Sequence, residues 1–62
     1  MKFRDGRDGQ YLSATVAKAI AIQRFERQGG DAAEMIGIIR RLDKEEEARE
    51  LFFDITTIEV FI

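Results

Sequence analysis

The last twelve residues constrain the fold of this chain more than any other segment. Eight of them are large and apolar: Leu51, Phe52, Phe53, Ile55, Ile58, Val60, Phe61 and Ile62. Chain ends normally fray into water, yet covering eight such side chains is worth roughly 12–24 kcal/mol at about 1.5–3 kcal/mol each. The sequence therefore predicts that this segment is buried, either in its own protomer or against a partner.

The small size of the chain favours oligomerisation. Its 62 residues suffice for one domain, and a domain of this size buries only about 60% of the surface that its unfolded chain exposes. Cysteine and histidine are both absent, so neither a disulfide nor a Cys/His zinc site can stabilise the domain. Helix packing and association remain, and we expect a homo-oligomer, most simply a dimer, with another protein as a second kind of partner.

The composition is that of a folded domain rather than a disordered one, with 45% hydrophobic and 35% charged residues. No apolar stretch approaches the length of a membrane span, and residues 1–8 carry both signs of charge without an apolar core. We therefore expect no membrane partner and a cytoplasmic location.

Charge is distributed unevenly along the chain. Residues 1–30 carry six Lys/Arg and three Asp/Glu, whereas residues 31–62 carry four Lys/Arg and nine Asp/Glu. The two halves thus have net charges of +3 and −5. Such asymmetry can orient one half against the other, within a protomer or across a dimer.

A β-hairpin is predicted over about residues 1–13. Asp5-Gly6 and Asp8-Gly9 stand between two short segments that mix polar and apolar residues, and Asp-Gly is a strong local signal for a hairpin turn. An isolated hairpin is marginal in water, so this one needs a third strand or a helix against it.

Two helices are predicted to follow, over about 14–28 and 31–42. The first is rich in alanine and ends at Gly29-Gly30. The second begins with Asp31-Ala-Ala-Glu34, a capping box. The apolar stripes of these helices are predicted to be core: Val16 and Ile20 on the first, and Met35, Ile36, Ile39 and Leu42 on the second.

A third helix is predicted over about 44–53. Glu45 and Glu46 interrupt the apolar stripe of the second helix, so we expect a break near Leu42 to Asp43. One continuous helix from about 32 to 53 is the alternative.

Residues 55–62 are rich in β-branched and aromatic side chains and are predicted to form a strand. A helical interpretation stays open, because Leu51, Ile55, Ile58 and Ile62 also fall at helical spacing. Together these elements predict an α+β fold, with an N-terminal hairpin, two or three helices and a C-terminal strand that completes a small antiparallel sheet, in this protomer or in a dimer.

The residue types give little support for catalysis. Histidine and cysteine supply the usual neutral-pH acid/base and the best nucleophile, and the chain has neither. The segment from Asp5 to Gly9 lacks the acidic spacing of an EF-hand and the Gly-Lys-Ser/Thr ending of a phosphate loop. We therefore predict no catalytic residue, no metal ligand and no cofactor. Besides the two hypotheses that follow, a third is an enzyme subunit that lends a carboxylate to a site shared with another subunit.

The leading hypothesis is a non-enzymatic protein-interaction module, such as a small homodimer, an adaptor, an inhibitor or an assembly subunit. It would use the apolar C-terminal segment and a strand edge. The predicted interface residues are Phe52, Phe53, Ile58, Val60, Phe61 and Ile62.

The alternative hypothesis is a small nucleic-acid-binding regulator. It would use five basic residues on the hairpin and the second helix: Lys2, Arg4, Arg7, Arg40 and Arg41. A pI near 5.0 argues against it, because domains that bind phosphate backbones generally have a clear basic surface.

Overall fold

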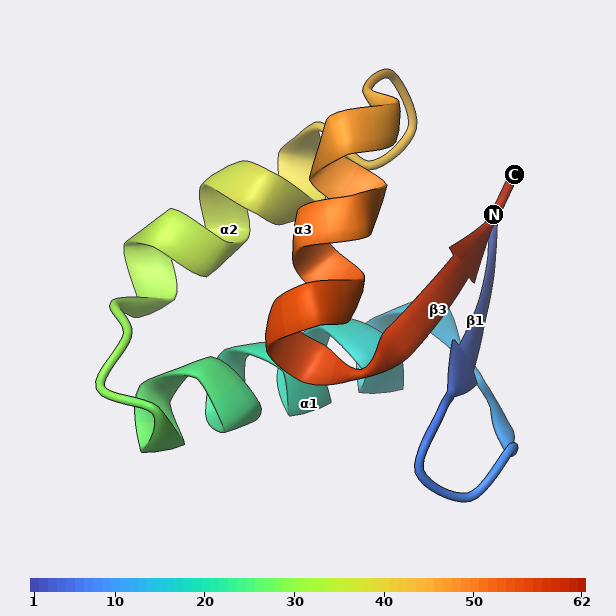
Figure 1. The fold of residues 1–62 in the computed structure, drawn as a ribbon, viewed down its shortest axis with the longest axis horizontal. Helices are drawn as coiled ribbons and strands as arrows, with labels where there is room; N and C mark the ends of the chain where they lie inside the picture. The colour runs from blue at the N-terminus through green and yellow to red at the C-terminus, as the bar shows by residue number, and fades with distance from the viewer.

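Three helices and a three-stranded antiparallel sheet make up the fold, as Figure 1 shows. The computed structural model describes all residues from 1 to 62. The elements follow in the order β1 (Lys2–Asp5), β2 (Tyr11–Leu12), α1 (Ala14–Arg27), α2 (Ala32–Arg40), α3 (Glu46–Thr56) and β3 (Ile58–Phe61). The predicted α+β class is confirmed.

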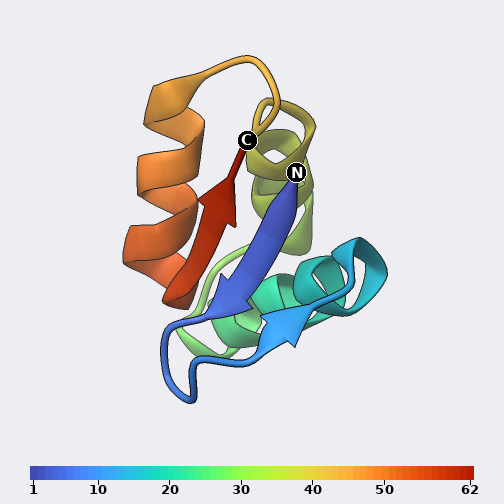
Figure 2. The ribbon, with the colours of Figure 1, turned by 90° about the vertical axis from the view of Figure 1, so that its right-hand side faces the viewer.

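The hairpin is completed by a third strand from the far end of the chain. The strand order is β2-β1-β3, with β1 antiparallel to both neighbours. Lys2 lies opposite Phe61 and Asp5 opposite Ile58, so the two chain ends lie side by side, as Figure 2 shows. β3 is therefore an edge strand, with α3 on its other side.

Each Asp-Gly pair of the hairpin turn has a distinct role. The Asp5 carboxylate accepts a hydrogen bond from the Arg7 N–H (3.0 Å), and the Asp8 carboxylate accepts one from the Gln10 N–H (2.9 Å). Gly9 has a φ of +75°, a conformation that glycine adopts without a steric cost. Local side-chain hydrogen bonds thus fix the turn that the sequence predicts.

Helix α1 is capped at both ends by residues of its own sequence. At its start, the Ser13 hydroxyl accepts a hydrogen bond from the Val16 N–H. At its end, Gly29 has a φ of +87° and donates to the Glu26 carbonyl, while the N–H of Gly30 donates to the carbonyl of Phe25. This pair of bonds is a Schellman motif, which explains the glycine at position 29. A Cβ at Gly30 would clash with the Phe25 ring, which explains the second glycine.

The chain between α2 and α3 forms turns over residues 41–44, so the two helices are separate. The Asp31 carboxylate caps the start of α2 by accepting from the Ala33 N–H (2.8 Å). The Leu42 carbonyl accepts a hydrogen bond from the Arg49 guanidinium (2.8 Å), and the Leu42 side chain is buried. These contacts hold the turn against α3. The predicted break is therefore confirmed, and the alternative of one continuous helix is wrong.

The C-terminal segment contains both of the conformations that its sequence allows. α3 continues to Thr56, beyond the expected end at residue 53, and β3 starts at Ile58. Between them Thr57 adopts a left-handed φ of +64°, which reverses the chain direction. The Thr56 hydroxyl donates to the Phe52 carbonyl and accepts from the Ile58 N–H, so one side chain joins the helix to the strand.

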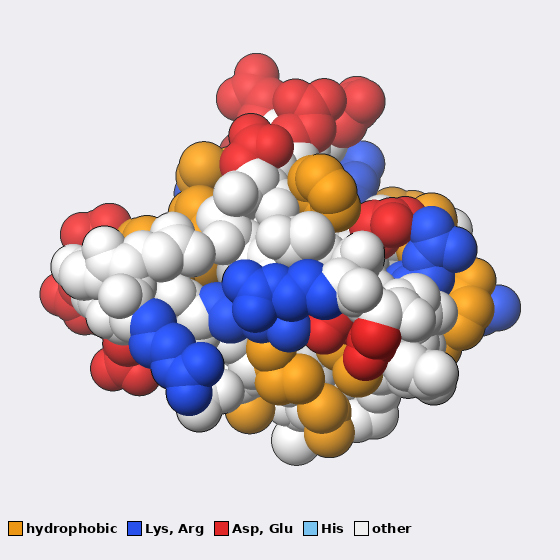
Figure 3. Space-filling view, turned by 60° about the horizontal axis from the view of Figure 1, so that its bottom comes forward, with side chains coloured by type: hydrophobic (Ala, Val, Ile, Leu, Met, Phe, Trp, Pro, Cys, Tyr) orange, Lys and Arg blue, Asp and Glu red, His pale blue; other side chains and the backbone are white.

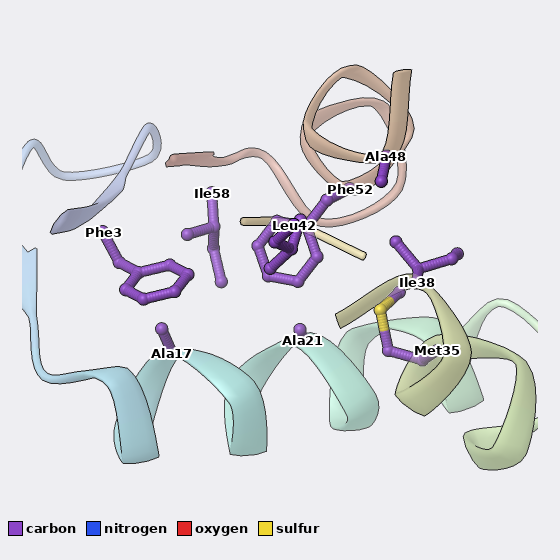
Figure 4. Close-up of a cluster of buried hydrophobic side chains, with 9 residues drawn as sticks. All are labelled: Phe3, Ala17, Ala21, Met35, Ile38, Leu42, Ala48, Phe52 and Ile58. Atoms are coloured by element: carbon purple, nitrogen blue, oxygen red, sulfur yellow. The ribbon is translucent and has the colours of Figure 1, made fainter. Parts of the chain in front are cut away.

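The core lies between the sheet and the three helices. Figure 4 shows Ala17 and Ala21 of α1 facing the rings of Phe3 and Phe52 and the side chain of Leu42. The two phenylalanine rings meet edge to face, with centroids 6.3 Å apart. The core has nine buried hydrophobic residues: Phe3, Ala17, Ala21, Met35, Ile38, Leu42, Ala48, Phe52 and Ile58.

The prediction that Val16 and Ile36 belong to the core is wrong. Val16 is 46% exposed and Ile36 is 39% exposed. On α1 the buried positions are the small residues Ala17 and Ala21, because small side chains let the aromatic rings of the sheet and α3 approach the helix closely.

No helix has the length and apolar character that a membrane-crossing segment requires.

Candidate interaction surface

The six predicted interface residues fall into two groups. Phe52 and Ile58 are fully buried in the core of their own protomer. Val60 is half-buried at the edge of the sheet. The other three remain exposed, with Phe53 at 41%, Phe61 at 40% and Ile62 at 76%. Of the six, only Phe53, Val60, Phe61 and Ile62 are therefore accessible to a partner of this folded protomer.

The outer face of the sheet is not covered by any helix. Side chains alternate along a strand, and Phe3 and Asp5 of β1 are buried on the helix side. The register places five residues on the opposite, outer face: Lys2, Arg4, Tyr11, Glu59 and Phe61.

The Arg4 side chain organises this outer face. Its guanidinium lies 2.8 Å from the Glu59 carboxylate and 5.6 Å from the centroid of the Phe61 ring. Tyr11 lies directly across from Arg4 on the neighbouring strand and is 65% exposed. The outer face thus presents two aromatic rings next to an ion pair that is open to solvent.

A second ion pair lies on the inner face, where it is almost fully buried. Both guanidinium nitrogens Nη1 and Nη2 of Arg24 donate to the Asp5 carboxylate, at 3.1 and 2.7 Å, and Nη1 also donates to the Thr56 carbonyl at 2.8 Å. The hydrogen bonds from Arg24, assisted by the Arg7 N–H, hold the pKa of Asp5 below its ordinary value, although burial opposes this shift. This pair joins β1, α1 and α3, and we assign it a structural role.

A shallow groove of about 330 Å³ runs between α3 and β3. It is lined by Glu46, Arg49, Glu50, Phe53 and Asp54 from α3 and by Glu59, Val60 and Phe61 from β3. Glu46, Glu50 and Asp54 recur every four residues and therefore share one face of the helix. The groove combines an apolar floor with an acidic wall.

The free edge of β3 borders this groove. The Gly6 N–H donates to the Thr57 carbonyl, so the backbone groups of Ile58 and Val60 point away from β1 in the alternating antiparallel pattern. The Ile58 N–H is satisfied by the Thr56 hydroxyl. The outward backbone groups that face no neighbouring strand are the Ile58 carbonyl and the N–H and carbonyl of Val60.

A second shallow hollow, of about 430 Å³, lies beside β1 and β2, near the N-terminus. It is lined by Met1, Lys2, Phe3, Tyr11, Leu12, Ser13 and Ala14. Met1 is 53% exposed and lies next to Ile62, because Lys2 pairs with Phe61. We use the name outer patch for the four exposed apolar residues Met1, Tyr11, Phe61 and Ile62.

The basic residues of the nucleic-acid hypothesis do not form one surface. Figures 1 and 2 both place the β1–β2 turn, which carries Arg7, and the end of α2, which carries Arg40, at opposite ends of the molecule. Arg4 is paired with Glu59, and Arg41 lies 3.7 Å from Glu45.

Basic side chains gather on one side of the molecule (Figure 3). Figure 3 views the side that carries α1 and the hairpin turn, and Lys and Arg side chains gather near its centre. Several Asp and Glu side chains lie at the upper and left margins of that view, and others lie beside the Lys and Arg side chains. No group of three or more acidic side chains has an arrangement that fits a metal ion.

Two features of these surfaces were not identified from the sequence. The pairing of Asp5 with Arg24 joins residues 19 positions apart, and no local pattern indicates it. The spacing of Glu46, Glu50 and Asp54 was a usable signal for one acidic helix face, but only the fold shows that this face lines the β3 edge.

Comparison with known protein families, curated proteins and solved structures finds no significant match to this chain.

Proposed function

We propose that this chain is a protein-interaction module without enzymatic activity, and that a second copy of the chain covers its outer patch. The observation that carries this proposal is the exposure of apolar side chains on the outer face and at its border: Tyr11 at 65% and Phe61 at 40% on the face, with Met1 at 53% and Ile62 at 76% at the adjoining chain ends. Contiguous exposed apolar residues with a polar rim are typical of interaction sites.

Charge selects a second copy for this face. Its central charges, Arg4 and Glu59, have opposite signs and lie side by side. A two-fold axis places the same surface on both sides of the interface, so Arg4 of one protomer can meet Glu59 of the other without repulsion. Two sheets packed through such faces form a sandwich, an arrangement with many precedents.

The expected dimer is weak rather than obligate. The exposed fractions of the four patch residues correspond to roughly 3–7 kcal/mol of burial still available in each protomer. Association itself costs about 4–15 kcal/mol, a cost of the same order as the gain from two protomers. Only a small surplus is left for binding, so we expect a dimer that forms in the millimolar range, and each protomer keeps its own nine-residue core.

Solution mass across a dilution series tests this proposal. Light scattering should show the mass rising from 7.1 kDa toward twice that value as the concentration increases. Phe61→Thr should keep the protein monomeric at concentrations where the wild type is dimeric. The matched control is Ile36→Thr, since Ile36 on α2 is 39% exposed and Phe61 is 40% exposed.

Each outcome of this test is decisive. A wild-type chain that stays monomeric at millimolar concentration contradicts the proposal, as does equal weakening by both variants. Circular dichroism must show that both variants are folded. Truncation of the tail is unsuitable, because Ile58 is part of the core.

A further inference from the structure

We infer that the groove between α3 and β3 binds an extended segment of a different protein that is rich in lysine or arginine and adds a strand to β3. This inference concerns a different surface from the outer patch, although Phe61 contributes to both.

The backbone of β3 provides the first argument. The Ile58 carbonyl and both backbone groups of Val60 point into the groove side and have no partner strand. An extended peptide that lies along this edge gains these hydrogen bonds whatever its sequence. β3 itself spans four residues, so a short strand of about five residues suffices to cover it.

The floor of the groove provides the second argument. Phe53 and Phe61 line it, and both rings are about 40% exposed. Side chains of an added strand alternate between the two sides of the sheet, so every second residue of the occupant would lie against these rings. Apolar residues at alternate positions are therefore expected.

The charges of the groove provide the third argument. None of the carboxylates of Glu46, Glu50 and Asp54 takes part in an ion pair within the chain. The guanidinium of Arg49, the one cation of the groove wall, donates to the Leu42 carbonyl, and Glu59 is already paired with Arg4. An occupant with lysine or arginine between its apolar residues would neutralise the three free carboxylates.

The same charges argue against a second copy as the occupant. Two-fold pairing of β3 with β3 would bring identical surfaces together, so the acidic wall of one protomer would approach the acidic wall of the other. Like charges brought together oppose association. The groove and the outer patch therefore differ in their preferred partners.

A peptide of about six residues that alternates lysine and valine is the probe for this inference. Binding to the full-length chain is measured by calorimetry, and the site is mapped by amide chemical shifts. The largest shifts should occur at Val60 and Phe61, and added salt should weaken binding. A peptide that alternates glutamate and valine should not bind.

Two controls separate strand addition from general attraction between opposite charges. The first is a peptide of the same charge that is N-methylated at alternate residues, which cannot donate along the edge. It should lose binding. The second is a matched pair of triple variants. Glu46→Gln/Glu50→Gln/Asp54→Asn should bind about tenfold more weakly, as expected from three exposed ion pairs of about 0.5 kcal/mol each.

The control triple variant, Glu26→Gln/Glu34→Gln/Asp43→Asn, removes the same charge from sites outside the groove and should bind like the wild type. Equal effects of both triple variants would overturn the inference, and so would equal binding of the N-methylated peptide or shifts that map to α1. If the groove variant instead dimerises through Val60, the occupant is a second copy and the inference is wrong. The outer-patch proposal is decided separately by the mass of the Phe61→Thr variant.

Discussion

The inner and outer faces of the sheet are made by the same strands but differ in what covers them. Each face contains one arginine–carboxylate pair, and β1 contributes one member of each. Asp5 supplies the carboxylate of the inner pair, and its neighbour Arg4 supplies the guanidinium of the outer pair. The Asp5–Arg24 pair on the inner face has side-chain exposures of 8% and 13%, whereas those of the Arg4–Glu59 pair on the outer face are 38% for Arg4 and 29% for Glu59.

This difference arises because the three helices lie on one face of the sheet only. Helices cover the inner face, so its ion pair is structural and its aromatic rings form the core. The outer face has no cover in the protomer, and its rings remain available for association. In this chain the helices cover one face of the sheet and leave the other open.

The largest expected effect comes from two neighbouring phenylalanines that point in different directions. Phe52 is fully buried and Phe53 is 41% exposed. Phe52→Ala should destabilise the protein by about 3–5 kcal/mol, since it leaves a cavity in the core. Phe53→Ala should cost about 1 kcal/mol, because that ring is only partly buried. Urea unfolding measures both, and equal losses would contradict the assignment of the two rings.

The next effect concerns the buried ion pair. Arg24→Met should destabilise the fold by about 3 kcal/mol, because it leaves the Asp5 carboxylate buried without its cation. Arg4→Met is the matched change on the outer face and should alter stability little, since exposed pairs contribute weakly. Denaturant titration of both variants checks this. A larger loss from Arg4→Met would reverse the comparison.

A smaller effect distinguishes the two glycines of the hairpin turn. A Cβ at Gly6 would lie 2.7 Å from the Thr57 carbonyl oxygen, whereas one at Gly9 would meet nothing within 4 Å. Gly6→Ala should cost about 2 kcal/mol through the backbone clash. Gly9→Ala should cost about 1 kcal/mol, because its φ of +75° strains an alanine. Thermal unfolding should rank them in this order, and the opposite order would contradict the close contact between β1 and the α3–β3 turn.

The smallest effect is a dependence of stability on pH through Asp5. Arg24 lowers the pKa of Asp5 in the folded state below the ordinary value of 3.8. The unfolded chain therefore binds this proton more readily, and the stabilisation is present above the ordinary pKa and is lost as pH falls through the folded value. The stability difference between wild type and Asp5→Asn should be constant near neutral pH and should shrink below about pH 4. Parallel curves down to pH 2 would contradict it.

Local chemistry explains why much of the fold could be predicted. The Asp31 cap, the Asp-Gly turn and the Gly29-Gly30 helix end each act through hydrogen bonds between residues close in sequence. Their patterns are visible in one dimension. A strand was also predicted over residues 55–62 from their β-branched side chains, although residues 55–56 belong to α3 and the strand starts at Ile58.

Long-range contacts explain what could not be predicted. Val16 and Ile36 fit the apolar stripes of their helices, yet the rotation of each helix against its neighbours leaves them exposed. Similarly, Phe52 and Phe53 are the same type of residue at adjacent positions. Only the packing of α3 on the sheet places Phe52 in the core and Phe53 in the groove.

By itself the sequence determined the hairpin turn, the caps of the first two helices, the apolar character of the C-terminal segment and the separation of charge between the two halves. Tertiary structure alone decided that β3 lies beside β1, that half of the C-terminal apolar residues stay exposed, and that an acidic helix face borders a free strand edge. The physical reason is that caps and turns depend on neighbours in sequence, whereas burial and ion pairing depend on which distant surfaces the packing brings together.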